Sequence, residues 1–181
     1  MQRIVSCLVA IVWALWLGGL GAVFLVLVSL FKTFEDRRVA GAAASGVFHL
    51  FERYQLILAA AGLVLILAWR VLGGAPRLKT TLFSLFGLAT LLAVSSTLYI
   101  TPRIEAMRQE GTTTGREFQK LHGVSSMLYT VEAALLLLGG FLLPSAIVRD
   151  DRRAAARGVR VTAESELPDE PRGAAAAQPA P

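Results

Sequence analysis

The chain has 181 residues, of which 55% are hydrophobic and 17% are charged, and its mean hydropathy is +0.59. Long charge-free runs exclude an ordinary soluble domain, because only a bilayer solvates such runs well. The formal net charge of +5 is modest. Basic residues near membrane ends usually set topology, so no nucleic-acid partner is expected. The single cysteine, Cys7, excludes an internal disulfide.

The first predicted membrane span covers residues 4–31, which carry no charged side chain. Arg3 precedes this run in the way that a basic residue opens a signal peptide. The run is, however, far longer than the roughly 7–15 residues of a signal core. We therefore expect a retained span, followed by a charged turn at residues 32–38.

The second predicted span covers residues 39–70 and is interrupted by His49, Glu52 and Arg53. Two interpretations fit it: an interfacial helix followed by a short span, or one long helix. A single helix would reach ~45 Å at about 1.5 Å per residue, which exceeds the ~30 Å hydrocarbon core. No proline interrupts the segment, so one long helix is favoured. Four glycines are predicted to be positions of close helix packing: Gly18, Gly21, Gly41 and Gly46.

Two further spans are predicted in the second half of the chain. Pro76 and the paired glycines before it predict a turn, after which the third span covers residues 78–101. Pro102 fits the first turn of a new helical piece. A polar turn at residues 111–115 then leads into the fourth span, residues 118–148.

Residues 4–148 are therefore predicted to form one four-span transmembrane domain, and residues 149–181 a disordered polar tail with few large apolar side chains to bury. Short connections make consecutive spans antiparallel neighbours. The predicted fold is thus an all-α integral membrane protein, an up-down four-helix transmembrane bundle. The lipid bilayer is its expected partner, with a second copy or another membrane protein as candidates for a protein partner.

Four spans place both chain termini on one side of the membrane. Basic residues near the span ends are slightly more numerous on that side. The positive-inside rule therefore favours termini in the cytoplasm.

Polar residues of the second and third spans are expected together on the opposite side. The second span enters there with His49, Glu52 and Arg53. The third span ends there at Pro102, and Arg108 follows in the next helical piece. These side chains are candidates for a polar site at one end of the bundle.

The fourth span extends this set inward. At 100° per residue, Ser125, Tyr129 and Glu132 lie within about 80° of His122 on the helix. A carboxylate at mid-membrane costs roughly 2.5–3.5 kcal/mol on insertion scales, so Glu132 should face the bundle. We expect His122 to lie within hydrogen-bond or one-water reach of the second or third span. The alternative is that His122 is only an interfacial side chain.

Several short motifs resemble one known family. They are "W-x-G-G" (Trp16, Gly18, Gly19), "LF" (Leu30, Phe31), "AG" (Ala40, Gly41), "TPRIEAMR" (residues 101–108) and "F-x-x-LH-x-x-S" (residues 118–125). Together they resemble a bacterial family of four-span proteins of unknown function that is similar to the eukaryotic transmembrane protein 205. The resemblance implies a multi-pass protein, here of the bacterial inner membrane, with no established catalytic activity. The positions that match recurrent residues of the family are Pro102, Arg108, Phe118, His122 and Ser125.

The sequence carries no signature of an enzyme, since it lacks the HExxH, CxxC, phosphate-loop and nucleophile-elbow motifs. Three classes of function remain. The first is a membrane scaffold without a ligand, and the second is a transport or efflux accessory for an ion or small cation. The third is a haem or metal site that uses His49 and His122, because haem takes two imidazoles from facing helices. We rank them in that order, so no cofactor is the leading expectation.

Overall fold

The computed structural model describes residues 1–74, 76–113 and 115–165, and this part of the chain is helical without any strand. The chain divides into two units, Met1–Ile147 and Val148–Pro181. The helices are α1 (Gln2–Thr33), α2 (Arg37–Gly73), α3 (Arg77–Ser95), the π-helical turn η1 (Ser96–Ile100), α4 (Thr101–Gln109) and α5 (Arg116–Ser165).

Four helical segments are long and apolar enough to cross a membrane: α1, α2, the run from α3 through α4, and α5 as far as Ala156. The predicted all-α fold with four membrane-spanning helices is therefore confirmed. Each predicted span lies within one of these segments.

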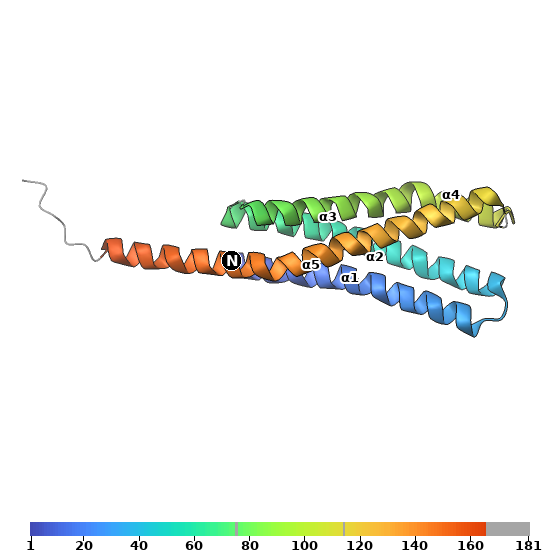
Figure 1. Cartoon of the computed structure of the whole chain (residues 1–181), viewed down its shortest axis with the longest axis horizontal. Helices are drawn as coiled ribbons and strands as arrows, with labels where there is room; N and C mark the ends of the chain where they lie inside the picture. The colour runs from blue at the N-terminus through green and yellow to red at the C-terminus, as the bar shows by residue number, and fades with distance from the viewer. Residues whose placement is uncertain (75, 114, 166–181) are drawn as a thin grey trace, which may run out of the picture. The chain divides into compact units, whose positions relative to one another are not determined.

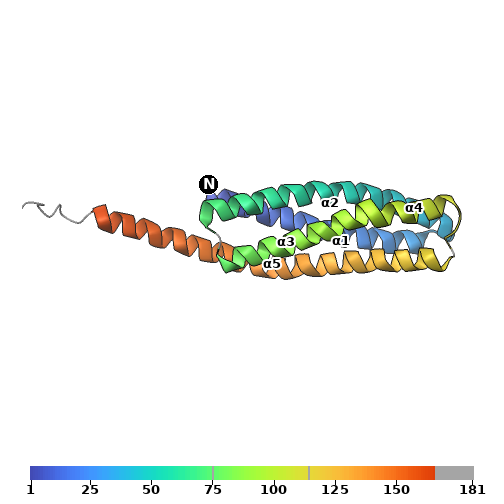
Figure 2. The ribbon, with the colours of Figure 1, turned by 90° about the horizontal axis from the view of Figure 1, so that it is seen from above.

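Consecutive membrane-spanning segments of the first unit run in opposite directions, and α3, η1 and α4 together form one of these segments (Figures 1 and 2). The α1–α2 and α4–α5 connections lie at the same end, which we call the loop end. The N-terminus and the α2–α3 turn lie at the other end. Because α2 and α5 both begin at the loop end, they run in the same direction through this unit.

Helix α2 is one continuous helix, which confirms the single-helix interpretation. Its first turn is capped by Asp36, whose carboxylate accepts the backbone N–H of Arg38 at 2.8 Å. The helix ends before Gly74, whose φ of +73° lies in the region that favours glycine. Local sequence signals thus define both ends of this long span.

The third span does not break at Pro102. The Thr101 N–H bonds to the Ser96 carbonyl, five residues back, and α4 follows directly. Pro102 has no N–H to donate, so the wider π turn accommodates the proline without a loop. The new helical piece predicted at Pro102 is therefore the direct continuation of the third span.

The core at mid-bundle is built around Phe86. Its ring lies 5.1 Å from that of Trp13 and 5.0 Å from that of Trp16, the latter edge-on. A Cβ added at Gly62 would overlap the Phe86 ring, and a Cβ at Gly139 would overlap Trp13. These two glycines let large aromatic rings reach the backbones of α2 and α5.

The glycines predicted to pack closely are different ones, and that prediction was wrong. Within the described part of the chain, a Cβ at Gly18, Gly21, Gly41 or Gly46 would meet no atom within 4 Å. Small residues permit a close approach, but a neighbour must also be placed opposite them.

Large apolar side chains cover the outside of the first unit. Well-exposed examples are Ile57, Val64, Val71, Leu91 and Phe141. A soluble surface would not carry so many, so this exterior suits contact with a lipid bilayer.

The second unit differs from the predicted disordered tail. Its backbone is helical through Ser165, so that prediction needs correction for residues 149–165. The segment is rich in alanine and arginine, which are strong helix formers. A helix that has already begun also propagates without a new nucleation cost. The rest of the predicted tail, residues 166–181, lies outside the described residues.

Candidate functional site

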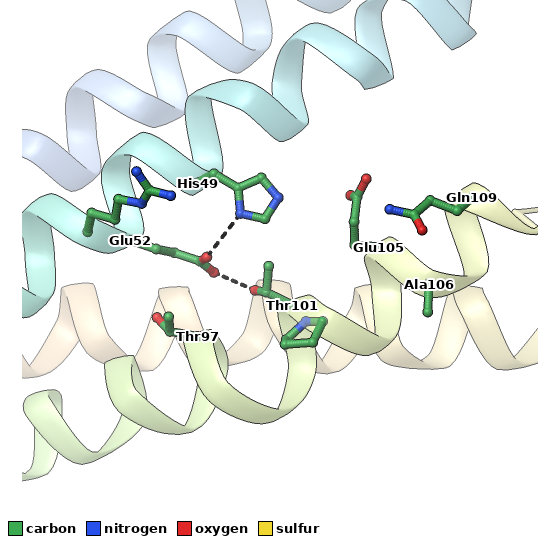
Figure 3. A pocket seen from close by; sticks show the side chains of 9 residues that line it. His49, Glu52, Thr97, Thr101, Glu105, Ala106 and Gln109 are labelled. Carbon is green, nitrogen blue, oxygen red and sulfur yellow. Dashed lines mark hydrogen bonds and ion pairs between the residues drawn. The ribbon is translucent and has the colours of Figure 1, made fainter.

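A pocket of about 370 Å³ opens between α2 and the run from η1 to α4 (Figure 3). It is lined by His49, Glu52, Arg53, Thr97, Thr101, Pro102, Glu105, Ala106 and Gln109. Four predicted site residues are among them: His49, Glu52, Arg53 and Pro102. The structure thus joins polar residues of the second and third spans.

Glu52 is the buried acid of this pocket, with 3% of its surface exposed. Its Oε1 accepts the hydroxyl of Thr101 and, at 3.3 Å, the hydroxyl of Tyr129. Its Oε2 lies 3.8 Å from Nδ1 of His49 (Figure 3). Groups from α2, α4 and α5 therefore meet on the carboxyl group of Glu52.

The second acid of the pocket, Glu105, is already paired. Its carboxylate accepts the Ser45 hydroxyl at 2.9 Å and lies 3.6 Å from Nη1 of Arg108. The same Nη1 donates to the Gly41 carbonyl at 3.0 Å. These contacts hold α4 against the first turns of α2. Arg108, a predicted site residue, thus lies beside the pocket in a structural role.

The negative charge of Glu52 is less well balanced by basic side chains than that of Glu105. His49 is half-exposed, at 49% of its side chain, and Arg53 is exposed. Among the described residues, no lysine or arginine forms an ion pair with Glu52. The pocket consequently presents one buried carboxylate to whatever enters it.

Glu132 lies deeper in the bundle than Glu52 and is fully buried. Its Oε1 accepts the indole N–H of Trp16 at 2.8 Å. This placement agrees with the expectation that a carboxylate at this depth points between helices. Its partner is a tryptophan on α1, which the sequence analysis did not connect with Glu132.

His122 does not reach the second or third span. It is exposed, and its ring stacks on Phe118, with centroids 6.1 Å apart. Positions four residues apart are neighbours on a helix surface, so Phe118 takes the contact that the prediction assigned to another span. Ser125 is half-buried one turn further on and does not line the pocket. The described structure thus gives no direct contact between His122 and the second or third span, which favours its interpretation as an interfacial side chain.

The two histidines are therefore not joined in one site. His49 pairs with Glu52, whereas His122 contacts its own helix. In the segments that the structure describes, no group of three or more His, Cys, Asp or Glu side chains is placed to hold a metal ion. The arrangement lends no support to the haem or metal alternative.

Several pocket residues were not predicted, namely Thr97, Glu105, Ala106 and Gln109. All follow from the uninterrupted helix around Pro102, which keeps successive turns of η1 and α4 on the face toward α2. The signal available in the sequence was the helical spacing of Thr97, Thr101 and Glu105, each four residues from the next.

Comparison with protein families finds one match. The model of the family described as Domain of unknown function (DUF4149) matches residues 11–113, which run from within α1 to beyond the end of α4 and include every residue that lines the pocket. No curated protein and no solved structure matches the chain.

Proposed function

The chain belongs to the DUF4149 family of unknown function, and from this premise we propose that it is a non-enzymatic transport or efflux accessory whose pocket binds a small cation at Glu52. The observation that carries the proposal is the Glu52 carboxylate, which is 3% exposed and faces a pocket of about 370 Å³. A buried acid within a membrane bundle is costly, and such groups commonly mark ion or substrate pathways.

The charges of the pocket favour a cation over an anion. Glu105 is paired with Arg108, whereas the basic side chain paired with Glu52 among the described residues is the half-exposed His49. Arg53 also lines the pocket, but it is exposed and its long side chain can extend toward solvent and the phosphate headgroups. The buried negative charge of Glu52 is then available to a small ammonium-type ligand.

We also propose a relationship to the transmembrane protein 205 family and a place in the bacterial inner membrane. The first rests on the "TPRIEAMR" and "F-x-x-LH-x-x-S" motifs. Four apolar helices support the second.

Cation binding is tested with purified full-length protein in detergent and methylammonium chloride as the ligand. Saturating methylammonium is expected to raise the thermal midpoint of unfolding by roughly 2–4 °C for each kcal/mol that ligand binding adds to the free energy of unfolding. Glu52→Gln keeps an acceptor for Thr101 and Tyr129 but removes the charge, so this rise should vanish. Glu35→Gln, in the exposed α1–α2 connection, is the matched control and should respond like the unaltered protein.

Two results would contradict the proposal. One is an equal rise in the Glu52→Gln variant. The other is no rise with ammonium, methylammonium or tetramethylammonium, which would favour a scaffold without a ligand.

Membrane topology is tested separately. Both termini are proposed to lie in the cytoplasm, since four spans and a slight excess of basic residues favour it. Reporter fusions after Lys32, Arg77, Gly115 and Arg160 should alternate outside and inside, beginning outside. Equal signals after Lys32 and Arg77 would refute four spans, whereas the inverse alternation would refute only the orientation.

A further inference from the structure

Below the pocket lies a second group of polar side chains that the proposed function does not use. The group consists of Gln55 on α2, Ser96 and Thr97 on η1, and Glu132 on α5. Gln55 and Glu132 are fully buried, and Ser96 is 1% exposed. Five of their atoms are buried without a hydrogen-bond partner in the described structure: Gln55 Nε2, Gln55 Oε1, Ser96 Oγ, Thr97 Oγ1 and Glu132 Oε2.

The helix register places these side chains in one layer. Helices α2 and α5 run in the same direction, and the Tyr129–Glu52 hydrogen bond aligns them. Gln55 follows Glu52 by three residues, and Glu132 follows Tyr129 by three residues. Each therefore lies about 4.5 Å farther from the loop end than the Tyr129–Glu52 hydrogen bond. We call Gln55, Ser96, Thr97 and Glu132 the deep polar layer.

The opposing helix supplies the other members of this layer. Thr101 meets Glu52 at the level of the pocket, and the α3–η1–α4 run proceeds toward the loop end. Ser96 and Thr97 precede Thr101 by about one turn. They therefore lie one turn deeper than Glu52, at the level of Gln55 and Glu132.

The π turn adds a backbone oxygen to the layer. In an α-helix the Thr97 carbonyl would accept the Thr101 N–H, but that N–H bonds to Ser96 instead. The next residue, Pro102, has no N–H to offer. The carbonyl of Thr97 thus lacks both of these helical donors, beside the unpaired Thr97 hydroxyl. π turns of this kind occur frequently at functional sites.

No basic side chain balances the layer. Glu132 receives only the neutral indole N–H of Trp16, and within the described residues it makes no ion pair. In an apolar bundle, unpaired oxygens and an uncompensated carboxylate are both costly. A cation would both coordinate the unpaired oxygens and balance the carboxylate.

We propose that the deep polar layer binds one dehydrated monovalent cation, Na⁺. The available ligands are hard oxygens: the Glu132 carboxylate, the Gln55 amide and the hydroxyls of Ser96 and Thr97, with the Thr97 carbonyl beside them. A single carboxylate matches a single positive charge. Calcium sites usually collect more acidic ligands, and softer metals prefer nitrogen or sulfur. Carbonyls of interrupted helices coordinate Na⁺ in the same manner in membrane transporters.

This layer borders the pocket, whose lining includes Thr97. Its charged ligand is Glu132 and not Glu52, so its occupancy does not rest on what the pocket binds. Ordered water is the competing occupant, because water also satisfies buried hydroxyls and amides. The two differ in charge, and only the ion makes stability depend on sodium concentration at constant ionic strength.

The test measures binding of ²²Na⁺ and thermal unfolding of full-length protein in nanodiscs, with N-methylglucamine chloride replacing NaCl. We expect about one bound Na⁺ per chain and a saturable rise of the unfolding midpoint, as linkage requires. Glu132→Gln should weaken sodium binding about tenfold or more, since it removes the charged ligand. Ser96→Ala and Thr97→Val should each weaken it about threefold to tenfold.

Glu35→Gln, in the exposed α1–α2 connection, is the matched control, because it removes a carboxylate outside both sites and should leave sodium binding unchanged. If Glu132→Gln fails to fold, the two hydroxyl variants decide the question. Sodium binding that is absent from the unaltered protein, or undiminished in Thr97→Val and Ser96→Ala, overturns the proposal. Methylammonium binding reports on Glu52 and sodium binding on Glu132, so failure of this site and failure of the proposed function are distinguishable.

Discussion

Replacing Gly139 by alanine is expected to destabilise the bundle by about 1–3 kcal/mol, the usual penalty of overpacking a filled core. The added methyl group would overlap the Trp13 ring. That ring cannot move aside cheaply, because its Nε1 donates to the Leu136 carbonyl at 2.6 Å and its face meets Phe86. Reversible unfolding in mixed micelles would measure the change in free energy.

The neighbouring glycine provides the control. A Cβ at Gly140 would approach Trp13 no closer than 3.7 Å, which is an ordinary contact. Gly140→Ala should therefore be neutral or stabilise by up to about 1 kcal/mol, because alanine restricts the unfolded chain. Equal losses for the two substitutions would show that Trp13 does not pack against Gly139 in this way.

Replacing Trp16 by phenylalanine is expected to cost about 1.5–3 kcal/mol of stability, because the buried carboxyl group of Glu132 loses its one hydrogen-bond donor. The phenyl ring keeps most of the packing against Phe86, so the loss reports mainly on the hydrogen bond. Measurement in sodium-free buffer keeps any ion from compensating the carboxylate.

Two comparisons isolate this interaction. Trp13→Phe removes a bond to a neutral backbone carbonyl and should cost only about 0.5–1.5 kcal/mol beyond lost packing. Adding Glu132→Leu to Trp16→Phe should recover stability, since no buried charge is then left unpaired. Strictly additive losses in that double variant would mean that the two side chains do not interact.

The sequence predicted the spans because hydropathy and turn chemistry are local properties. Charge-free runs, the Asp36 cap and the Gly74 turn define the long helices without reference to their neighbours. Span depth likewise predicted that Glu132 would face inward. The same local approach failed at the predicted tail, where alanine and arginine favour a helix although there is little apolar surface to bury.

The partners of the polar residues depended on the tertiary structure. Side chains from three helices meet at Glu52, and only the relative rotation and register of those helices determine which side chains they are. His122 shows the limit of this reasoning, because helical periodicity put it on one face with Tyr129 but did not predict that its ring stacks on Phe118.

The glycines show most clearly the difference between what the sequence predicts and what the tertiary structure decides. All of these residues look alike in the sequence, yet Gly19, Gly62 and Gly139 lie opposite aromatic rings, whereas Gly18, Gly21, Gly41 and Gly46 do not. By itself, the sequence determined that this protein is a four-helix membrane bundle with polar groups at one end, because the bilayer imposes span length and apolar composition. Only the tertiary structure decided which groups share the pocket and the deep polar layer, because those contacts depend on how neighbouring helices are rotated and offset.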